Sequence, residues 1–198
     1  LNIGNSKISC AVSEIEKNKK IKLLSFQSFQ TNIIKKNIIT NFEELSHDIK
    51  SLISESEKKS QTKINSVNLN IPMIDSISRY YESEIENLGQ KISDLDIKKV
   101  INNSEYFNVN DDYYQIFNNI NGYILDGNLL LNSPVGNYAN KLKILFYKIL
   151  IPFKNIQSYQ NVIKSQNISI ESYVPSPLSS SLATLSNDEK KIGTICID

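Results

Sequence analysis

The residues best suited to hold a ligand lie in the first short turn of the chain, Gly4-Asn5-Ser6-Lys7. A glycine at a hairpin tip lets backbone N–H groups approach an anion closely, and the Ser6 hydroxyl and the Lys7 ammonium would add donors beside it. This pattern therefore favours a phosphate group as ligand. The same residues are also a common connection between two strands, so a purely structural turn remains the alternative.

Other polar residues offer weaker chemistry. Asp111 and Asp112 follow a run of polar residues in a predicted loop, where carboxylates usually serve the turn itself. The serines 179–181 fall inside a predicted helix without a base in reach. His47 is the only histidine, and its helical spacing from Leu45 places it on the solvent face. These residues give little support to a Ser-His-Asp triad or a histidine-rich metal site.

Composition and charge exclude further classes. Cys10 and Cys196 form no CxxC pair, so we interpret both as small apolar core residues of a reducing compartment. A net charge of +1 leaves no surplus for a non-specific grip on nucleic acid. The longest apolar run, Leu142–Phe153, is interrupted by Lys143 and Lys148 and falls short of the ~18 residues of a membrane span. No signal segment begins the chain, which favours the cytosol.

Two patterns of apolar spacing predict the elements of the first 152 residues. Period-two alternation and turn signals predict strands at Leu1–Ile3, Ile8–Val12, Ile21–Thr31 and Ile64–Ile71, with a helix capped by Asn41 and Glu44 before the last of them. After Pro72 the pattern becomes strand, helix, strand, strand. These elements are Ile74–Glu84, a helix capped by Ser93 and Asp96, Tyr113–Leu125 and Leu142–Ile151. We interpret residues 73–152 as an inserted subdomain.

The remaining residues return to an alternation of helix and strand. The spacing predicts a helix over Lys154–Gln166, a strand over Ile168–Val174 and a helix that begins at Pro177. Leu178, Leu182 and Leu185 are expected on the core side of that helix, and Ile192–Asp198 as a final buried strand. The fold class is therefore α/β with an α+β insert.

The order of these elements resembles the N-terminal part of FtsA, a family of actin-like bacterial cell-division proteins. The resemblance rests on collinear segments, which are LNIGNSKISCAVSEI, IKKNIITNFEELSHDIK, INSVNLNIP, GYILDGN, NSPVGNY and PSPLSSSLATLSNDEKKIGTICID. It implies one lobe of an actin-like ATPase of ribonuclease H-like fold. Residues 1–72 and 153–198 would form its subdomain 1A, and residues 73–152 the family's inserted subdomain (1C or SHS2), of strand-helix-strand-strand type.

The resemblance also implies a function. FtsA proteins bind ATP with Mg²⁺, help to assemble the division ring, link FtsZ to the membrane and recruit later division proteins. The role is one of assembly, with at most weak ATPase activity. FtsZ would bind through parts outside this chain, and a C-terminal helix outside it would contact the membrane. Residues 73–152 would supply contacts for self-association and for late division proteins, especially through exposed sheet edges. The expected location is the cytoplasmic face of the cell membrane at the septum.

The family's ligand residues carry over to this chain in part. Its first phosphate loop reads Asp-x-Gly-Thr/Ser-x-Lys, and here the segment is Asn2-Ile3-Gly4-Asn5-Ser6-Lys7. The resemblance thus implies nucleotide binding by Gly4, Asn5, Ser6 and Lys7, and by Asp198, which matches the Asp of the second phosphate loop. Asn2 and Asp198 take the positions linked to magnesium. Asn2 replaces the family's Asp and lacks the negative charge that a hard cation favours.

Two alternatives from the same superfamily remain open. One is an actin-like platform protein of type IV pilus assembly, which carries a similar insert. The other is an enzyme, a sugar kinase or a phosphatase, that would use the phosphate loop for catalysis. The insert favours the two assembly proteins over the enzyme, and the amide at Asn2 disfavours catalysis.

Overall fold

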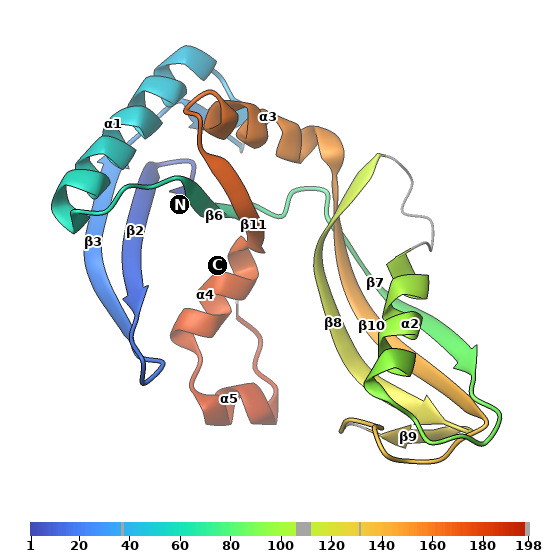
Figure 1. Ribbon diagram of the computed structural model, residues 1–198. Coiled ribbons are helices and arrows are strands. Elements are labelled where there is room, and N and C mark those ends of the chain that lie inside the picture. The colour runs from blue at the N-terminus through green and yellow to red at the C-terminus, as the bar shows by residue number, and fades with distance from the viewer. Residues whose placement is uncertain (37, 106–111, 131, 197–198) are drawn as a thin grey trace. The chain divides into compact units, whose positions relative to one another are not determined.

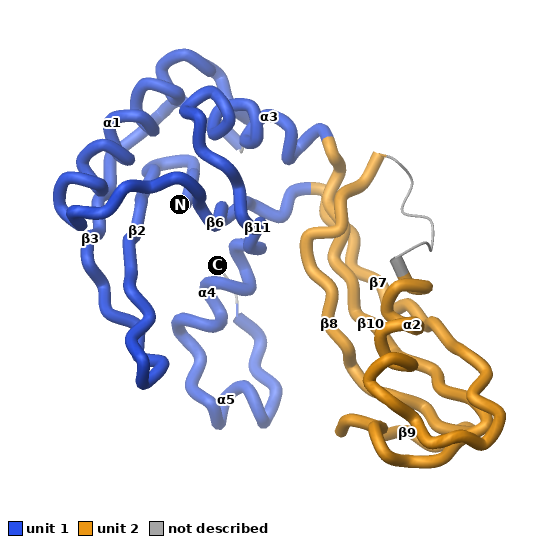
Figure 2. The backbone as a smooth tube through the Cα atoms, viewed as in Figure 1, with its two compact units in different colours: residues 1–74, 154–198 blue, residues 75–153 orange. Residues whose placement is uncertain are grey.

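The computed structural model describes residues 1–36, 38–105, 112–130 and 132–196. The chain divides into two compact units, of which unit 1 comprises Leu1–Ile74 and Lys154–Asp198, and unit 2 comprises Asp75–Phe153 (Figure 2). Their assignment to the subdomains 1A and SHS2 stays a prediction.

Unit 1 is built on a five-stranded sheet with the strand order β11-β6-β1-β2-β3 (Figure 1). The strands β1, β3, β6 and β11 run in one direction, and β2 runs antiparallel to its two neighbours β1 and β3. The elements in chain order are β1 (Asn2–Ile3), β2 (Lys7–Ile15), β3 (Ile21–Gln30), β4 (Ile34–Lys35), β5 (Ile38–Ile39), α1 (Phe42–Ser60), β6 (Ser66–Ile71), α3 (Phe153–Lys164), β11 (Ser169–Pro175), α4 (Ser176–Thr184) and α5 (Asn187–Ile192).

The core of unit 1 lies between this sheet and the helices α1 and α3. Ile3, Ile8 and Leu69 are buried on the side of the sheet that the helices cover. The predicted cap of α1 is confirmed, because the Asn41 side chain accepts a hydrogen bond from the Glu44 N–H at 3.2 Å. The Ser46 and Ser165 hydroxyls, 3.1 Å apart, join α1 to the end of α3, which places both helices on one face.

The other face of this sheet carries polar side chains. Because side chains alternate along a strand, Asn2, Ser9 and Asn70 point away from the helices that bury their neighbours. The strand β1 has only two residues, and on its amino side an open cleft of about 430 Å³ separates β2 from β6. Its walls include Ala11 of β2 and Ser66 of β6.

Unit 2 is a four-stranded antiparallel sheet, ordered β7-β10-β8-β9, with one helix packed on one face (Figure 1). Its elements are β7 (Ile77–Glu86), α2 (Asp94–Glu105), β8 (Tyr113–Leu125), β9 (Asn128–Leu130) and β10 (Lys141–Pro152). The predicted cap of α2 is confirmed, since the Ser93 hydroxyl donates to the Asp96 carboxylate at 2.6 Å. Strict alternation in β10 buries Leu142, Ile144 and Phe146 toward the core.

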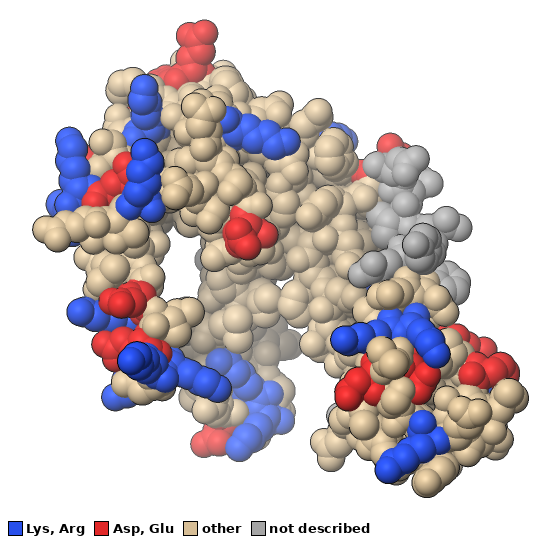
Figure 3. All heavy atoms as spheres, in the orientation of Figure 1, with Lys and Arg blue, Asp and Glu red and all other residues tan. Residues whose placement is uncertain are grey.

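The opposite face of the unit 2 sheet carries aromatic rings and ion pairs. The rings of Tyr80 and Tyr147 lie 5.3 Å apart between centroids, and Phe117 meets Tyr147 edge-on. Lys143 forms an ion pair with Glu82 at 2.6 Å. Acidic and basic side chains stand beside one another on unit 2 and along α1 in the face that Figure 3 shows, so no patch of one sign gathers on either.

Several sequence predictions prove wrong near the end of the chain. The predicted final strand Ile192–Asp198 is not formed over its described residues, since Ile192 ends the helix α5 and residues 193–196 belong to no strand. Leu182, predicted to face the core, is 57% exposed, and no residue of α4 is buried. Cys196 is exposed rather than buried, whereas Cys10 is buried as predicted. Asp198 and Asp111 lie outside the described residues.

Candidate phosphate-binding site

The turn between β1 and β2 is a tight hairpin closed by its own backbone. The Gly4 N–H donates to the Lys7 carbonyl at 3.0 Å, and the Thr31 N–H donates to the Ser6 carbonyl at 3.0 Å. A Cβ atom on residue 4 would stand only 3.1 Å from the Lys7 carbonyl oxygen, so this close approach of backbone to backbone favours glycine. The exposed side chains of Ser6 and Lys7 follow at the tip.

The hairpin lies at the carboxyl edge of the parallel strands. The strands β1, β6 and β11 run in the same direction, so their carboxyl ends meet at one edge, and α4 begins directly after β11. Ligands of open α/β sheets bind outside this edge, where loops and helix starts replace the strands. The predicted residues Gly4, Asn5, Ser6 and Lys7 therefore lie together where a ligand would be expected. Asp198 is outside the described residues.

Asn2 at the base of the hairpin belongs to a chain of neutral hydrogen bonds. The Asn70 Nδ2 group donates to Asn2 Oδ1 at 2.9 Å, and Ser179 Oγ lies 3.1 Å from Asn70 Oδ1. Ser179 Oγ is also 2.9 Å from the Ser176 carbonyl, so its single proton is shared between two acceptors. We call Asn2, Asn70 and Ser179 the amide relay. It connects β1, β6 and α4 across parts of the chain that are distant in sequence.

The amide relay and the hairpin do not fit a divalent metal. The residues Asn2–Lys7 contain no carboxylate, and the Asn2 oxygen already accepts a hydrogen bond. Hard cations such as Mg²⁺ favour carboxylate and phosphate oxygens. In the part of the chain that the structure describes, no group of three or more His, Cys, Asp or Glu side chains could hold a metal ion. The donors at the turn suit an anion instead.

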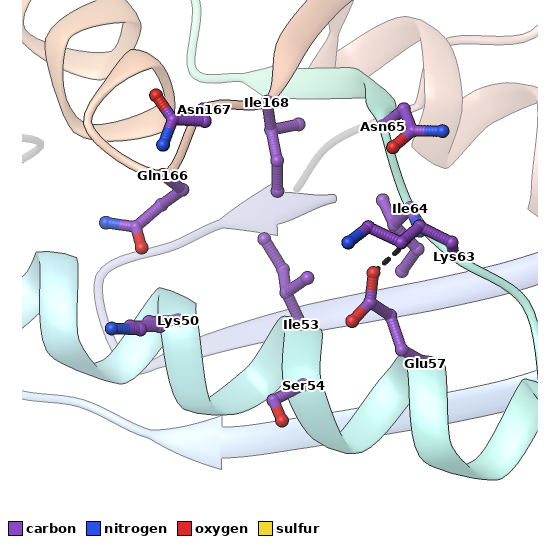
Figure 4. A pocket seen from close by; sticks show the side chains of 10 residues that line it. All are labelled: Lys50, Ile53, Ser54, Glu57, Lys63, Ile64, Asn65, Gln166, Asn167 and Ile168. Carbon is purple, nitrogen blue, oxygen red and sulfur yellow. Dashed lines mark hydrogen bonds between the residues drawn. The ribbon is translucent and has the colours of Figure 1, made fainter.

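A pocket lies near the amino ends of β6 and β11, at the opposite edge of the sheet from the hairpin (Figure 4). It has a volume of about 400 Å³, and it lies between the second half of α1 and the loops that precede β6 and β11. The Glu57 carboxylate accepts a hydrogen bond from the Ile64 N–H at 2.8 Å and so holds one of these loops. Its lining residues are Lys50, Ile53, Ser54, Glu57, Lys63, Ile64, Asn65, Gln166, Asn167 and Ile168. Because Glu57 is engaged in the fold and this edge is the less usual one for ligands, the hairpin is the better candidate.

The arrangement of elements defines an actin-like lobe. A chain of the PilM–PilN type IV pilus biogenesis complex superposes on 91% of this chain and 48% of its own length, with a TM-score of 0.57 at 10% sequence identity. This likeness confirms the predicted actin-like fold class.

The whole chain is similar to the cell division protein FtsA of several bacteria. It is 22% identical to FtsA of Agrobacterium fabrum over 208 residues, 23% identical to FtsA of Neisseria meningitidis over 198 residues, and 22% identical to FtsA of Streptococcus pneumoniae over 200 residues. Each alignment covers 100% of this chain but only 47%, 48% and 44% of the relative. No protein-family profile matches the chain. The predicted FtsA-like, actin-like character is confirmed, and the chain spans about half the length of these relatives.

Proposed function

We propose that this chain is part of an actin-like cell-division protein that helps to assemble the bacterial division ring. The supporting observation is similarity to FtsA along the entire chain, which includes the inserted unit as well as the sheet of unit 1. The protein would act by assembly, linking FtsZ to the cytoplasmic face of the membrane and recruiting later division proteins. Among the described residues, no helix is both long enough and apolar enough to cross a membrane.

Contacts with partners or with further copies would involve unit 2. In the part of the sheet that is described, β7 pairs only with β10, and β8 pairs with β9 only over Tyr123–Leu125, so backbone groups remain open at both sides. Open strand edges accept additional strands.

The hairpin would bind the phosphates of a nucleotide. Its support is the closed turn at the carboxyl edge together with the donors of Ser6 and Lys7. ATP would be the natural ligand, used for assembly with at most slow hydrolysis.

A localisation experiment tests the proposed function. The protein that carries this chain, fused to a fluorescent protein in its own host, is expected to form a ring at mid-cell that coincides with FtsZ. A matched fusion lacking residues 75–153 should be expressed at the same level and lose the ring if unit 2 makes the assembly contacts. A uniform or polar distribution of the intact fusion in dividing cells would contradict the division role.

A further inference from the structure

We propose that the hairpin binds phosphate groups without a divalent cation, and that the amide relay sets this property. The inference rests on the proposed phosphate site and concerns how that site balances charge. Actin-like nucleotide sites are expected to use a carboxylate that orients hydrated magnesium. Here the corresponding position is Asn2, a neutral amide.

A hydrogen bond from Asn70 orients the Asn2 side chain. Its oxygen accepts the hydrogen bond from Asn70 Nδ2, so its own Nδ2 group lies on the other side, next to Gly4. A Cβ atom on residue 4 would stand 3.7 Å from this nitrogen. The Asn2 group nearest the turn is therefore an N–H₂ donor. A donor stabilises a phosphate oxygen directly and repels a cation.

The residues around the proposed ligand carry a positive charge and no negative one. Lys7 is the one ionised side chain among residues 2–7, and these residues contain no carboxylate. A carboxylate at this position would repel a phosphate, and a bound cation would relieve that repulsion. With an amide at this position, nothing there repels the phosphate, so no cation is needed to neutralise a negative side chain.

Asn70 and Ser179 are positioning residues in this proposal. Asn70 holds the Asn2 amide in its donor-outward orientation, and Ser179 lies 3.1 Å from the Asn70 oxygen at the other end. Ser179 comes from α4, so the relay ties the start of that helix to the base of the hairpin. Their hydrogen bonds lead from α4 through Asn70 to the Asn2 side chain, so we assign both residues a role that acts through Asn2.

The test is isothermal titration of the 198-residue chain with tripolyphosphate and with ATP, each in EDTA and in excess Mg²⁺. The natural chain is expected to bind at least as tightly in EDTA as in Mg²⁺, because the proposed site needs no cation. Asn2→Asp should bind about tenfold more weakly in EDTA and recover with Mg²⁺, because its new charge repels the phosphate unless a cation intervenes. The matched control is Asn68→Asp, which adds the same charge on β6 two residues before Asn70. The Asn68 side-chain oxygen accepts a hydrogen bond from the Ser172 hydroxyl at 2.7 Å and takes no part in the amide relay. The Asn68→Asp substitution should change the dissociation constant by no more than about twofold in either buffer.

The outcomes separate this inference from the function on which it rests. Binding of the natural chain in Mg²⁺ but not in EDTA would overturn cation independence and leave the phosphate site intact. Absence of binding in both buffers would overturn the phosphate site and this inference together. A second measurement covers misfolding, because the thermal unfolding midpoint of Asn2→Asp should stay close to that of the natural chain. Asn70→Ala should weaken binding in both buffers without creating a need for Mg²⁺.

Discussion

At the residue scale, Lys7 carries the positive charge of the candidate site. We predict that Lys7→Ala weakens tripolyphosphate binding about ten- to a hundredfold, because a hydrogen bond to a charged group is worth about 1.5–3 kcal/mol. Isothermal titration of the two proteins measures this difference. Lys17→Ala is the matched control, since Lys17 is an exposed lysine in the turn at the far end of β2. An equal loss in both variants would show that general charge, rather than the hairpin, holds the anion.

Sequence alone could find only the local half of this site. Gly4, Ser6 and Lys7 are adjacent, so their donors could be predicted from a short segment. Asn70 and Ser179 could not, because they lie 68 and 109 positions from their relay partners. Parallel pairing of β1 with β6 brings Asn70 beside Asn2, and the start of α4 after β11 brings Ser179 to Asn70. The serine was predicted only as a residue of a helix without chemistry.

At the element scale, helices with clear caps and strands with strict alternation were predictable. The capping pairs at α1 and α2 and the period-two pattern of β10 are local signals that the fold preserves. The strand β9 was missed although Asp126-Gly127 is a typical two-residue hairpin turn, with φ of 46° and 91°. The helix α5 was also missed, although Ser186 and Glu189 form a capping box. Apolar composition suggested a strand there, but a strand also needs a neighbour with which to pair.

Asp126 holds the turn after β8 against the start of β10. Its carboxylate accepts hydrogen bonds from the Asn140 N–H at 3.0 Å and the Lys141 N–H at 2.9 Å. These hydrogen bonds, the one from Asn140 more than the one from Lys141, lower the pKa of Asp126 below its ordinary value. A lowered folded-state pKa contributes stability that is present above the unfolded value, about 3.9, and is lost as the pH falls through the folded value.

We therefore predict that Asp126→Asn reduces the pH dependence of unfolding below about pH 4 and lowers the unfolding midpoint at pH 7. The amide keeps one acceptor oxygen but loses the charge that strengthens both hydrogen bonds. Urea unfolding at a series of pH values, with hydrogen exchange of unit 2 as the readout, measures both effects. Glu55→Gln, at an exposed position on α1 in unit 1, is the control and should leave the exchange of unit 2 unchanged. If the stability of unit 2 fell with pH equally in Asp126→Asn and in the natural chain, the Asp126 carboxylate would not be the source of that pH dependence.

At the scale of the whole molecule, two separate cores hold the chain together. Leu142 is fully buried in unit 2, and Ile49 is fully buried in unit 1. We predict that Leu142→Ala destabilises unit 2 and Ile49→Ala destabilises unit 1, each by about 2–5 kcal/mol, because each leaves a cavity in a packed core. Hydrogen exchange resolved by peptide should rise only within residues 75–153 for the first variant. It should rise only within residues 1–74 and 154–196 for the second.

These two variants serve as controls for each other, since the truncations are similar in size. Faster exchange across the entire chain in both variants would mean that the two units unfold as one cooperative body. Independent responses would mean that unit 2 could change its contacts during assembly without loss of the hairpin site in unit 1.

The amide relay also has a consequence at the level of the gene. Asn and Asp codons differ only in their first base, so a single transition at codon 2 would exchange the amide for a carboxylate. Asn70 Nδ2 can donate to either side chain, since both present an oxygen in the same place. The relay would therefore accept an aspartate at position 2 without a second mutation. If the amide relay sets cation independence as proposed, one base change at this codon would introduce a need for magnesium while the hydrogen bond from Asn70 is kept.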